Sequence, residues 1–373
     1  MLDAESLTLL AASVARYGRE KYSFEARKAL PGRAPGFSLA AWQDYADMGW
    51  LAAHLPVEDG GFGGDARAIA ALMRYAGEHL ALEPLFASVV LAGGVLAACE
   101  GAAARGRLEA LAGGSRIFAL AHAEGLGDGM DGSVEAVVRA GCLTGHKRMV
   151  LHGDVADELI VSARAAGEGS TALYALDTSL VGVRRSPMRL LDGRGAASFV
   201  FAAVPVTQLV SAAADGWLDH ARLALCAEAH GAMRALNRDT LAYLKMRRQF
   251  GRPIGANQTL QHRMTELYML EQEVAAVIDA AQRACVSAAG EPDARSRRAL
   301  NGAAAHCLHA GRQIAHEAVQ LHGGIGTTDA LAVSHYFKRI MVLNQLLGDR
   351  DAHLDAFAAA DAVGGARPAP PHT

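Results

Sequence analysis

The sequence predicts three consecutive parts: an N-terminal α-helical domain over residues 1–115, a middle antiparallel β-barrel or sandwich over residues 116–208, and a C-terminal four-helix bundle over residues 209–361. Two patterns lead to this fold class. Apolar residues recur at helical spacing in the first and last parts, whereas the middle part holds short apolar runs between turn residues. Strands do not alternate with helices, which argues against Rossmann folds and β/α barrels.

In the first part, the spacing of apolar residues predicts helices over Ala40–Leu51 and Ala66–Leu82. The segment Pro56–Gly64 between them holds four glycines, which allow backbone conformations with positive φ. We therefore expect a loop there.

The middle part contains short runs suited to strands, and turn residues such as Gly127–Gly129 and Asp192–Gly193 separate them. Because no helix lies between these runs, they favour an antiparallel arrangement. The predicted strands are Arg116–His122, Val134–Arg139, Glu158–Ala163, Ala172–Leu176 and Ser198–Ala202.

The last part predicts four long helices, which pack most naturally as an up-down bundle. Residues 362–373 are rich in Gly and Pro, and we expect this tail to be disordered. The predicted helices are Asp219–Gln249, Thr259–Ala289, Ala294–Gln320 and Ala332–Ala359.

Composition excludes several function classes. A net charge of −3 and a pI of about 6.6 give no electrostatic case for binding nucleic acid or an anionic membrane. We find neither a secretory signal nor a run of about twenty apolar residues that predicts a membrane span. The five cysteines are scattered without a Cys-x-x-Cys pair, which suits a reducing cytoplasm and argues against a metal site.

The first chemical motif is Arg247–Gly255, followed by Gln258–His262. Basic residues, two glycines and a proline predict the end of a helix. Taken alone, this motif fits a basic helix end and loop as well as it fits a binding site. The planar guanidinium of Arg247 suits the oxygens of a diphosphate at a subunit border.

The second motif is Gln320–Thr328, with Gly323, Gly324 and Gly326 in a short loop. Glycines let a backbone approach a ligand closely, although such loops are commonly plain turns between helices. The two motifs together, at this spacing, are much more specific than either alone.

With both motifs, the β region and the Pro56–Gly64 loop, the chain resembles the acyl-CoA dehydrogenase family over nearly its whole length. The resemblance implies an acyl-CoA dehydrogenase-like fold, FAD as cofactor and an acyl-CoA substrate. It also implies binding of FAD that belongs to a neighbouring subunit. The residues implied at that border are Arg247, Phe250, Gly251, Gln320, Gly323 and Gly324. We expect His322 to line the same loop.

The resemblance extends to the β part. Ala119–Glu124, with Ala121 and His122, is similar to the family segment that cradles the pyrimidine end of the flavin, and Gly145–Gly153 is similar to the strand that packs on the flavin ring. This implies flavin contacts at Met149 and Leu151. Many family members have a hydroxyl residue beside flavin N5, and Leu151 cannot donate that hydrogen bond.

The family reaction needs a base, usually glutamate, that removes the proton α to the thioester carbonyl. A desolvated carboxylate has the raised pKa that suits this task. The two positions that supply it in different family branches are Gly348 and Ala221 here, and Arg222 after the latter is the implied substrate-binding residue.

Three explanations for the missing glutamate stay open, in this order of preference. A partner subunit carries the base, as in the paired acyl-CoA dehydrogenases whose short subunits this chain resembles, including those for dicarboxylyl (pimeloyl-type) and steroid side-chain thioesters. Alternatively, Asp349 acts from one position along, or Glu228 reaches the site from two turns further along the first bundle helix. A structural role is the simpler interpretation of Glu228. We expect Tyr336–Arg339 to combine packing with solvated charge.

The leading function is therefore an FAD-dependent acyl-CoA dehydrogenase subunit that desaturates the α,β bond of an acyl-CoA in lipid catabolism. The alternative is a catalytically silent subunit that completes a partner's FAD site. A flavin oxidase or monooxygenase is a third hypothesis. By analogy, the oligomer is a homo- or hetero-dimer or tetramer, and the electron acceptor is an electron-transfer flavoprotein.

Overall fold

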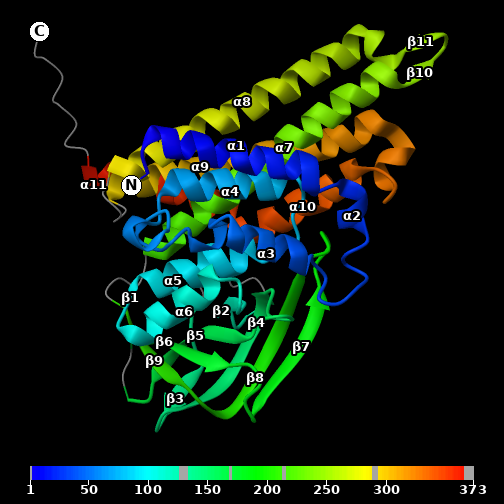
Figure 1. Ribbon diagram of the computed structural model, residues 1–373. Helices are drawn as coiled ribbons and strands as arrows, with labels where there is room; N and C mark the ends of the chain where they lie inside the picture. Colours follow the sequence, from blue (N-terminus) through cyan, green and yellow to red (C-terminus); the bar gives the residue numbers. More distant parts are fainter. Residues whose placement is uncertain (1, 126–132, 168–169, 212–215, 288–292, 365–373) are drawn as a thin grey trace, which may run out of the picture.

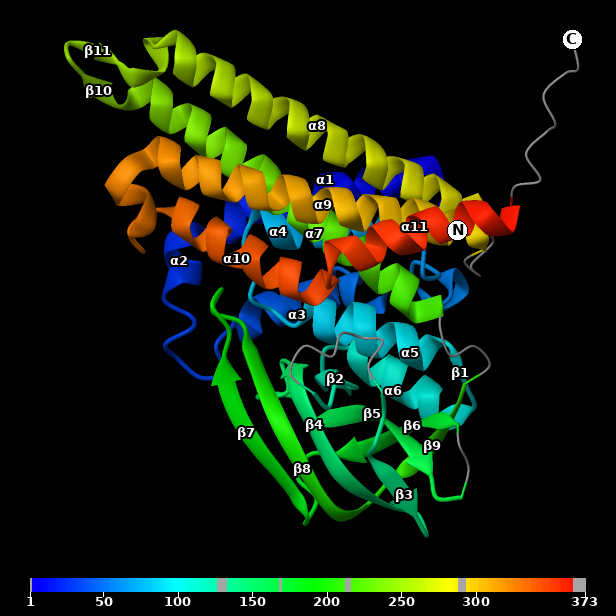
Figure 2. The same cartoon turned by 180° about the vertical axis from the view of Figure 1, so that it is seen from behind.

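The computed structural model describes residues 2–125, 133–167, 170–211, 216–287 and 293–364. Two helical layers and a sheet make up the molecule, and the long bundle helices lie across one end of the sheet (Figure 1). The reverse view shows the same order of layers (Figure 2). The predicted helical, β and helical organisation is confirmed.

The N-terminal helices pack on the bundle and on the sheet. Helix α4 lies along α7, and α1 packs on α4. Ser23, Ser38 and Asp65 are N-caps whose side chains accept backbone N–H bonds, which fixes where three of these helices begin. The helices are α1 (Ala4–Lys21), α2 (Phe24–Lys28), α3 (Leu39–Asp47), α4 (Ala66–Glu78), α5 (Gly93–Ala97) and α6 (Ala102–Ala112), with a π-helix η3 (Leu85–Ala92) before α5.

The described strands form one large sheet and a small hairpin. The strand order in the sheet is β1-β9-β6-β5-β3-β4-β8-β7, with β2 beside β5. Most pairs are antiparallel, but β5 pairs in parallel with both β2 and β3, so the sheet is mixed rather than wholly antiparallel. The strands are β1 (Cys99–Glu100), β2 (Phe118–Ala121), β3 (Val137–Arg139), β4 (Cys142–Leu151), β5 (Glu158–Ala165), β6 (Thr171–Asp177), β7 (Val183–Arg189), β8 (Gly195–Pro205) and β9 (Thr207–Ser211).

The bundle consists of α7 (Gly216–Met246), α8 (Gln258–Ser287), α9 (Ala294–His322) and α10 (Ala332–Leu347), followed by α11 (Arg350–Gly364). The predicted single helix over Ala332–Ala359 is therefore wrong. It breaks at Gly348, whose φ of +95° ends α10 in a conformation that favours glycine. This break gives Asp349 its position.

Two glycines allow α4 and α7 to touch. A Cβ atom at Gly77 would overlap the backbone of Glu228, and a Cβ atom at Gly231 would overlap the backbone of Arg74. The absence of a side chain at both positions therefore brings the backbones of the two helices into contact.

Two predictions fall outside the described residues: the turn at Gly127–Gly129 and the tail beyond Gly364. Of residues 362–373, the first three form the last turn of α11. No disulfide joins the five cysteines, all of which lie in the described part of the chain. Among the described helices, none is long and apolar enough to cross a membrane.

Candidate active site

An apolar cavity of about 110 Å³ lies where the sheet meets the bundle. Its walls come from η3, the end of β2, the end of β4, α7 and the end of α10. The lining residues are Phe86, Leu91, Leu120, His122, Ala123, Arg148, Met149, Val150, Leu151, Leu225, Gln345 and Leu346. We name it the apolar cavity. Three residues predicted to contact the flavin are among them: His122, Met149 and Leu151.

The end of β4 is irregular. Its pairing with β8 shifts register between Lys147 and Val150, and Met149 has a φ of +52°. Such bulges redirect side chains and are common beside active sites. Met149 is 43% exposed, whereas Leu151 is buried in the cavity wall. The strand thus presents a short length of irregular backbone to the cavity.

A buried ion pair holds the segment after β2 in place. The Nζ atom of Lys147 donates to the backbone oxygen of His122 and to the carboxylate of Glu124, each at 2.7 Å. Although burial opposes ionisation, Lys147 and the amides of Ala136 and Glu135 hold the pKa of Glu124 below its ordinary value. Lys147 therefore fixes the His122 backbone at the cavity mouth.

A second and larger cavity, of about 630 Å³, lies between α9, the end of α10 and the start of α11. Gln345 lines both cavities, so they lie on either side of the end of α10. We name it the basic cavity after Arg312 and Arg350, although the carboxylates of Glu317 and Asp349 also line it. The lining residues are Leu308, His309, Arg312, Gln313, His316, Glu317, Asn344, Gln345, Gly348, Asp349 and Arg350.

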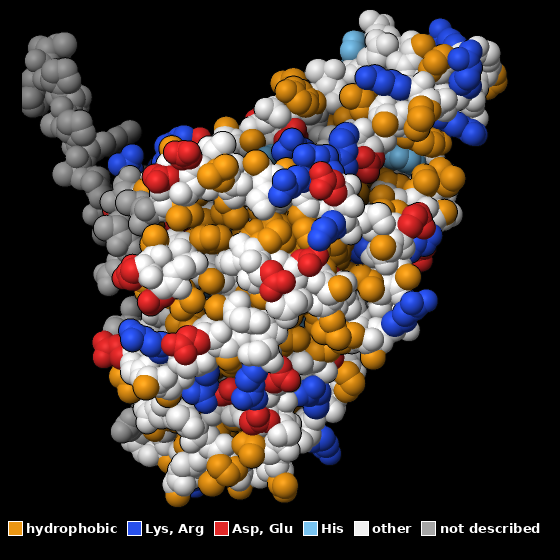
Figure 3. All heavy atoms as spheres, in the orientation of Figure 1, with side chains coloured by type: hydrophobic (Ala, Val, Ile, Leu, Met, Phe, Trp, Pro, Cys, Tyr) orange, Lys and Arg blue, Asp and Glu red, His pale blue; other side chains and the backbone are white. Residues whose placement is uncertain are grey.

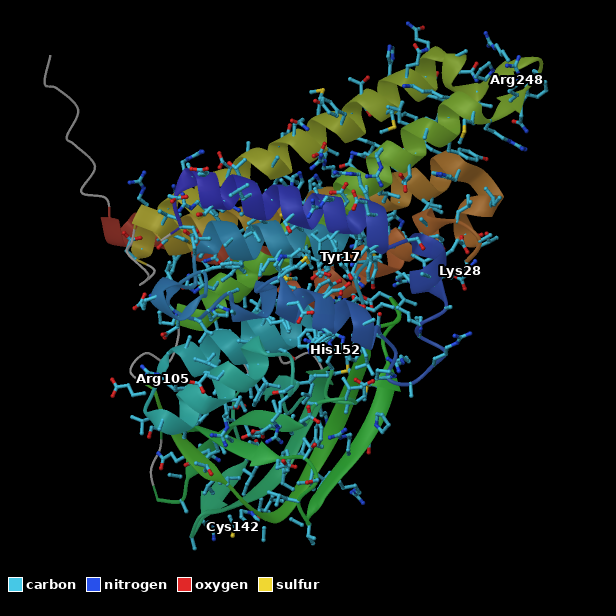
Figure 4. The ribbon with its side chains drawn as sticks, viewed as in Figure 1. Tyr17, Lys28, Arg105, Cys142, His152 and Arg248 are labelled. Atoms are coloured by element: carbon cyan, nitrogen blue, oxygen red, sulfur yellow. The ribbon has the colours of Figure 1, made fainter. Side chains whose placement is uncertain are left out.

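The first motif forms a hairpin beyond the end of α7. Strands β10 (Arg248–Gln249) and β11 (Arg252–Pro253) pair, and Phe250 and Gly251 between them have φ of +51° and +81°. Two successive residues with positive φ make a tight two-residue turn. Phe250 is fully exposed at its tip, and Figure 4 shows the neighbouring Arg248 at the far end of the bundle. Arg247 is also exposed.

The second motif lies at the same end of the bundle. The rings of Tyr243 and His322 stack at 4.3 Å, which ties the end of α7 to the end of α9. Gln320, Gly323 and Gly324 are exposed, and a Cβ atom at either glycine would meet nothing within 4 Å. The structure therefore brings the two predicted border motifs together, and it sets them apart from the β4 residues.

Hydrophobic and basic side chains gather on the end of the molecule that carries the hairpin (Figure 3). Exposed apolar residues lie near the end of α7 (Leu241, Met246), at the hairpin tip (Phe250) and in the Gly323–Thr327 segment after α9 (Ile325). Tyr268 and Met269 lie further along α8. An exposed apolar area of this kind suits contact with another protein chain.

Glu228, predicted as a candidate base, is 1% exposed and lies between two guanidinium groups. Its Oε1 atom is 2.6 Å from Arg339 Nη1 and 3.3 Å from Arg194 Nη1. Two ion pairs stabilise the carboxylate, whereas a base needs a desolvated carboxylate without such partners. The geometry corresponds to the structural interpretation of Glu228. Arg339 is itself fully buried, so the expectation of solvated charge at Tyr336–Arg339 is wrong at that residue.

Asp349, the other candidate base, is exposed in the basic cavity and caps α11. Its carboxylate accepts the N–H of Asp351 at 3.1 Å, and its backbone oxygen accepts the N–H of His353. Arg222 forms an ion pair at 3.0 Å with Asp219 in the first turn of α7, one turn before Leu225 of the apolar cavity. Ala121 is fully buried in β2 and does not line that cavity.

Sequence reasoning missed several cavity residues. Phe86 and Leu91 come from the π-helix, and Leu225, Gln345 and Leu346 come from the bundle. Their sequence signal is ordinary helical hydrophobicity, which does not distinguish a cavity wall from a core. No Asp or Glu is among the described residues that line the apolar cavity. Likewise, no group of three or more His, Cys, Asp or Glu in the described ranges could hold a metal ion.

Comparison with known proteins shows which family the chain resembles. The model for the acyl-CoA dehydrogenase C-terminal domain matches residues 211–360. The acyl-CoA dehydrogenase IpdE2 of Mycolicibacterium smegmatis is 29% identical over 92% of this chain and 95% of its own length. The chain is thus similar to acyl-CoA dehydrogenases over nearly its whole length, and its C-terminal part matches the model of their C-terminal domain.

Solved structures give the same acyl-CoA dehydrogenase fold. The ChsE4–ChsE5 complex from Mycobacterium tuberculosis matches with a TM-score of 0.85 and 23% identity, covering 98% of this chain and 99% of that one. A glutaryl-CoA dehydrogenase from Mycobacterium smegmatis, solved with FADH2, matches with a TM-score of 0.83 and 18% identity, covering 98% and 96%.

Proposed function

We propose that this chain is a subunit of an FAD-dependent acyl-CoA dehydrogenase that desaturates the α,β bond of an acyl-CoA thioester. The single observation that carries the proposal is the apolar cavity, which gathers His122, Met149 and Leu151 from two strands against the bundle. The similarity to acyl-CoA dehydrogenases supplies the reaction type. We also propose a cytoplasmic location, because scattered cysteines suit a reducing compartment.

The residues present fit an elongated flavin dinucleotide. The β2 and β4 residues of the apolar cavity offer a flat ring system hydrophobic walls, and its η3 and α10 residues are left for an acyl chain. Arg312 and Arg350 of the adjoining basic cavity suit a diphosphate. Arg247, Phe250 and Gln320 lie at the other end of the bundle and are exposed. This placement supports their role at a second chain's cofactor, since both motifs face outward together.

When bound, FAD would accept the hydride that leaves the β carbon of the acyl group. The chain's own contribution is positional. Leu151 and Leu225 exclude water from the apolar cavity, and Lys147 holds the His122 backbone at its mouth. Removal of the α proton needs a base, and neither Glu228 in its ion pairs nor Asp349 as a helix cap is well arranged for that task.

The second candidate, a silent subunit that completes a partner's FAD site, is favoured by the lack of a carboxylate among the described residues that line the apolar cavity. The heteromeric ChsE4–ChsE5 complex offers a precedent for pairing of two chains within this fold. We therefore propose a second acyl-CoA dehydrogenase subunit as the partner and an electron-transfer flavoprotein as the electron acceptor.

Co-expression tests both candidates. The chain is purified alone and with each acyl-CoA dehydrogenase encoded beside it, and flavin absorbance and acyl-CoA turnover are measured. Yellow protein with turnover from the chain alone would establish an autonomous enzyme. Colourless protein that becomes yellow and active only with a partner supports the heteromer. Failure to bind flavin in any combination would refute the proposal.

Changing the base in the heteromer then separates the two candidates. Turnover that disappears when the partner's glutamate is replaced by glutamine, while this chain is unaltered, identifies this chain as the silent subunit. Turnover that survives this change assigns catalysis to the cavity of this chain.

A further inference from the structure

Three consecutive carbonyl groups between α4 and η3 are bound by side chains from three separate elements. In the segment Leu80–Leu82, the first carbonyl accepts from Arg27 Nε of α2 at 3.1 Å, and the second accepts from Arg339 Nη2 of α10 at 2.8 Å. The third accepts from His152 Nε2 at 2.9 Å, because a carbonyl oxygen can only accept. His152 follows β4, and Figure 4 shows it between the sheet and the helices.

The backbone of this segment is strained. Leu80 has a φ of +54°, which is unfavourable for a residue with a branched side chain. Such conformations persist only where the surroundings enforce them, and they gather at functional sites. The segment leads directly into η3, and Phe86 and Leu91 of η3 line the apolar cavity. Its position therefore sets the position of one cavity wall.

Arg339 is held in a single orientation by two buried carboxylates. Its Nε atom is 2.8 Å from Asp192 Oδ2 and its Nη1 atom is 2.6 Å from Glu228 Oε1, while Arg194 bridges both acids. Burial disfavours the charge of Arg339, but Asp192 and Glu228 outweigh burial and raise its pKa. The remaining N–H groups can therefore point steadily at the Leu80–Leu82 carbonyls.

Arg339 lies on α10, the helix whose end forms the opposite cavity wall. Gln345 and Leu346 follow it by six and seven residues on α10, which is about 10 Å along the helix axis. One side chain thus connects the π-helix wall to the α10 wall.

We propose that Arg339 is a positioning residue: by clamping Leu80–Leu82, it fixes the distance between η3 and α10 and so determines how wide an acyl group the apolar cavity admits. The contacts that set the cavity width are independent of the ligand, whereas the identity of the ligand as an acyl group rests on the proposed function. Arg339→Lys keeps the positive charge but has one ammonium group, which cannot serve two carboxylates and a carbonyl in the planar geometry of a guanidinium.

The test compares Arg339→Lys with Arg283→Met, an arginine change at an exposed ion pair on α8. Both are made in the FAD-loaded assembly. Hydrogen exchange is followed in peptides covering residues 80–92, and dissociation constants are measured for FAD, butyryl-CoA and cyclohexanecarbonyl-CoA. We expect Arg339→Lys to raise exchange in that segment and to change the ratio of the two acyl-CoA constants, each by about tenfold. The dissociation constant of FAD should change less than twofold in Arg339→Lys. In Arg283→Met, hydrogen exchange and all three dissociation constants should change less than twofold.

The proposal is overturned if folded Arg339→Lys protein matches the wild type both in hydrogen exchange of residues 80–92 and in the ratio of the two acyl-CoA dissociation constants. If Arg339→Lys fails to fold, Glu228→Gln takes its place, because it retains Arg339 but removes one of the charges that orient it. Hydrogen exchange and the ratio of the acyl-CoA dissociation constants then decide in the same way. If the wild-type assembly binds no acyl-CoA, the proposed function fails. In that case, the exchange measurement still tests the clamp.

Discussion

The carboxylate of Asp349 accepts the backbone N–H of Asp351 at 3.1 Å, which makes it the N-cap of α11. An N-cap side chain stabilises a helix whether or not it takes part in catalysis. This contact provides a way to separate the structural role of Asp349 from its predicted role as a base.

Asp349→Asn should keep the cap, and Asp349→Ala should lower the free energy of unfolding by about 1 kcal/mol. We expect turnover of the active assembly to be unchanged in Asp349→Asn, because an amide caps a helix as well as a carboxylate does. Urea unfolding and steady-state kinetics measure the two effects. Loss of turnover in stably folded Asp349→Asn would identify Asp349 as the base after all.

Glu228→Ala should be far more costly. Removal of this carboxylate leaves Arg194 and Arg339 buried without one of their counter-charges, and breaking a buried pair costs about 3–5 kcal/mol. Glu228→Gln, which retains the shape and hydrogen-bonding atoms, should lose less. The midpoint of urea unfolding gives both values. A loss below 1 kcal/mol in Glu228→Ala would contradict the structural role.

Phe250→Ser should weaken assembly and FAD retention without changing the stability of the isolated chain. The side chain is fully exposed at the hairpin tip, so its replacement should alter unfolding by less than about 0.5 kcal/mol. Analytical ultracentrifugation and flavin absorbance after gel filtration report the effect. Val181→Ser is the matched control, since Val181 is 94% exposed after β6. Equal behaviour of the two variants would remove the hairpin from the subunit border.

Acid should destabilise the protein partly through His152. Burial lowers the pKa of His152 to about 4, below the value of 6.5 for an exposed imidazole. The unfolded state therefore binds the proton more readily, so the contribution to stability is complete above pH 6.5 and disappears as the pH falls to about 4. Its size is on the order of 3 kcal/mol.

The groups whose charge acts on His152 are Arg194, Asp192 and Arg339. His152→Gln keeps an N–H that can reach the Leu82 carbonyl but cannot titrate. Its free energy of unfolding should fall less than that of the wild type between pH 7 and pH 4. His262→Gln, at an exposed position on α8, is the control. Parallel pH profiles for wild type and His152→Gln would refute the assignment.

Gly77→Ala should destabilise the protein by about 2 kcal/mol or more, because the added methyl group overlaps the α7 backbone at Glu228. Gly106→Ala on α6 meets nothing within 4 Å and should instead stabilise its helix by about 0.5–1 kcal/mol. Urea unfolding of the two variants gives opposite signs. Equal signs would mean that α4 and α7 can move apart at little cost.

Local patterns were sufficient for the order and type of the long elements. Helical spacing predicted α7, α8 and α9 to within three residues at each end, and the glycines and proline after α7 predicted its end. The break at Gly348 was missed because the hydrophobic pattern continues through it. Strand β7 was missed as well, since Val183–Arg189 is an edge strand with mostly polar, exposed residues.

The sequence by itself determined the helical, β and helical order and the positions of the motifs Arg247–Gly255 and Gln320–Thr328, because these depend on local spacing and residue type. Only the tertiary structure decided what Glu228, Arg339 and Asp349 do. Each is a charged residue on or beside a helix, and its role depends on which distant groups surround it. Arg339 meets Asp192 from the sheet and Leu80–Leu82 from the N-terminal part, and no local pattern encodes those contacts.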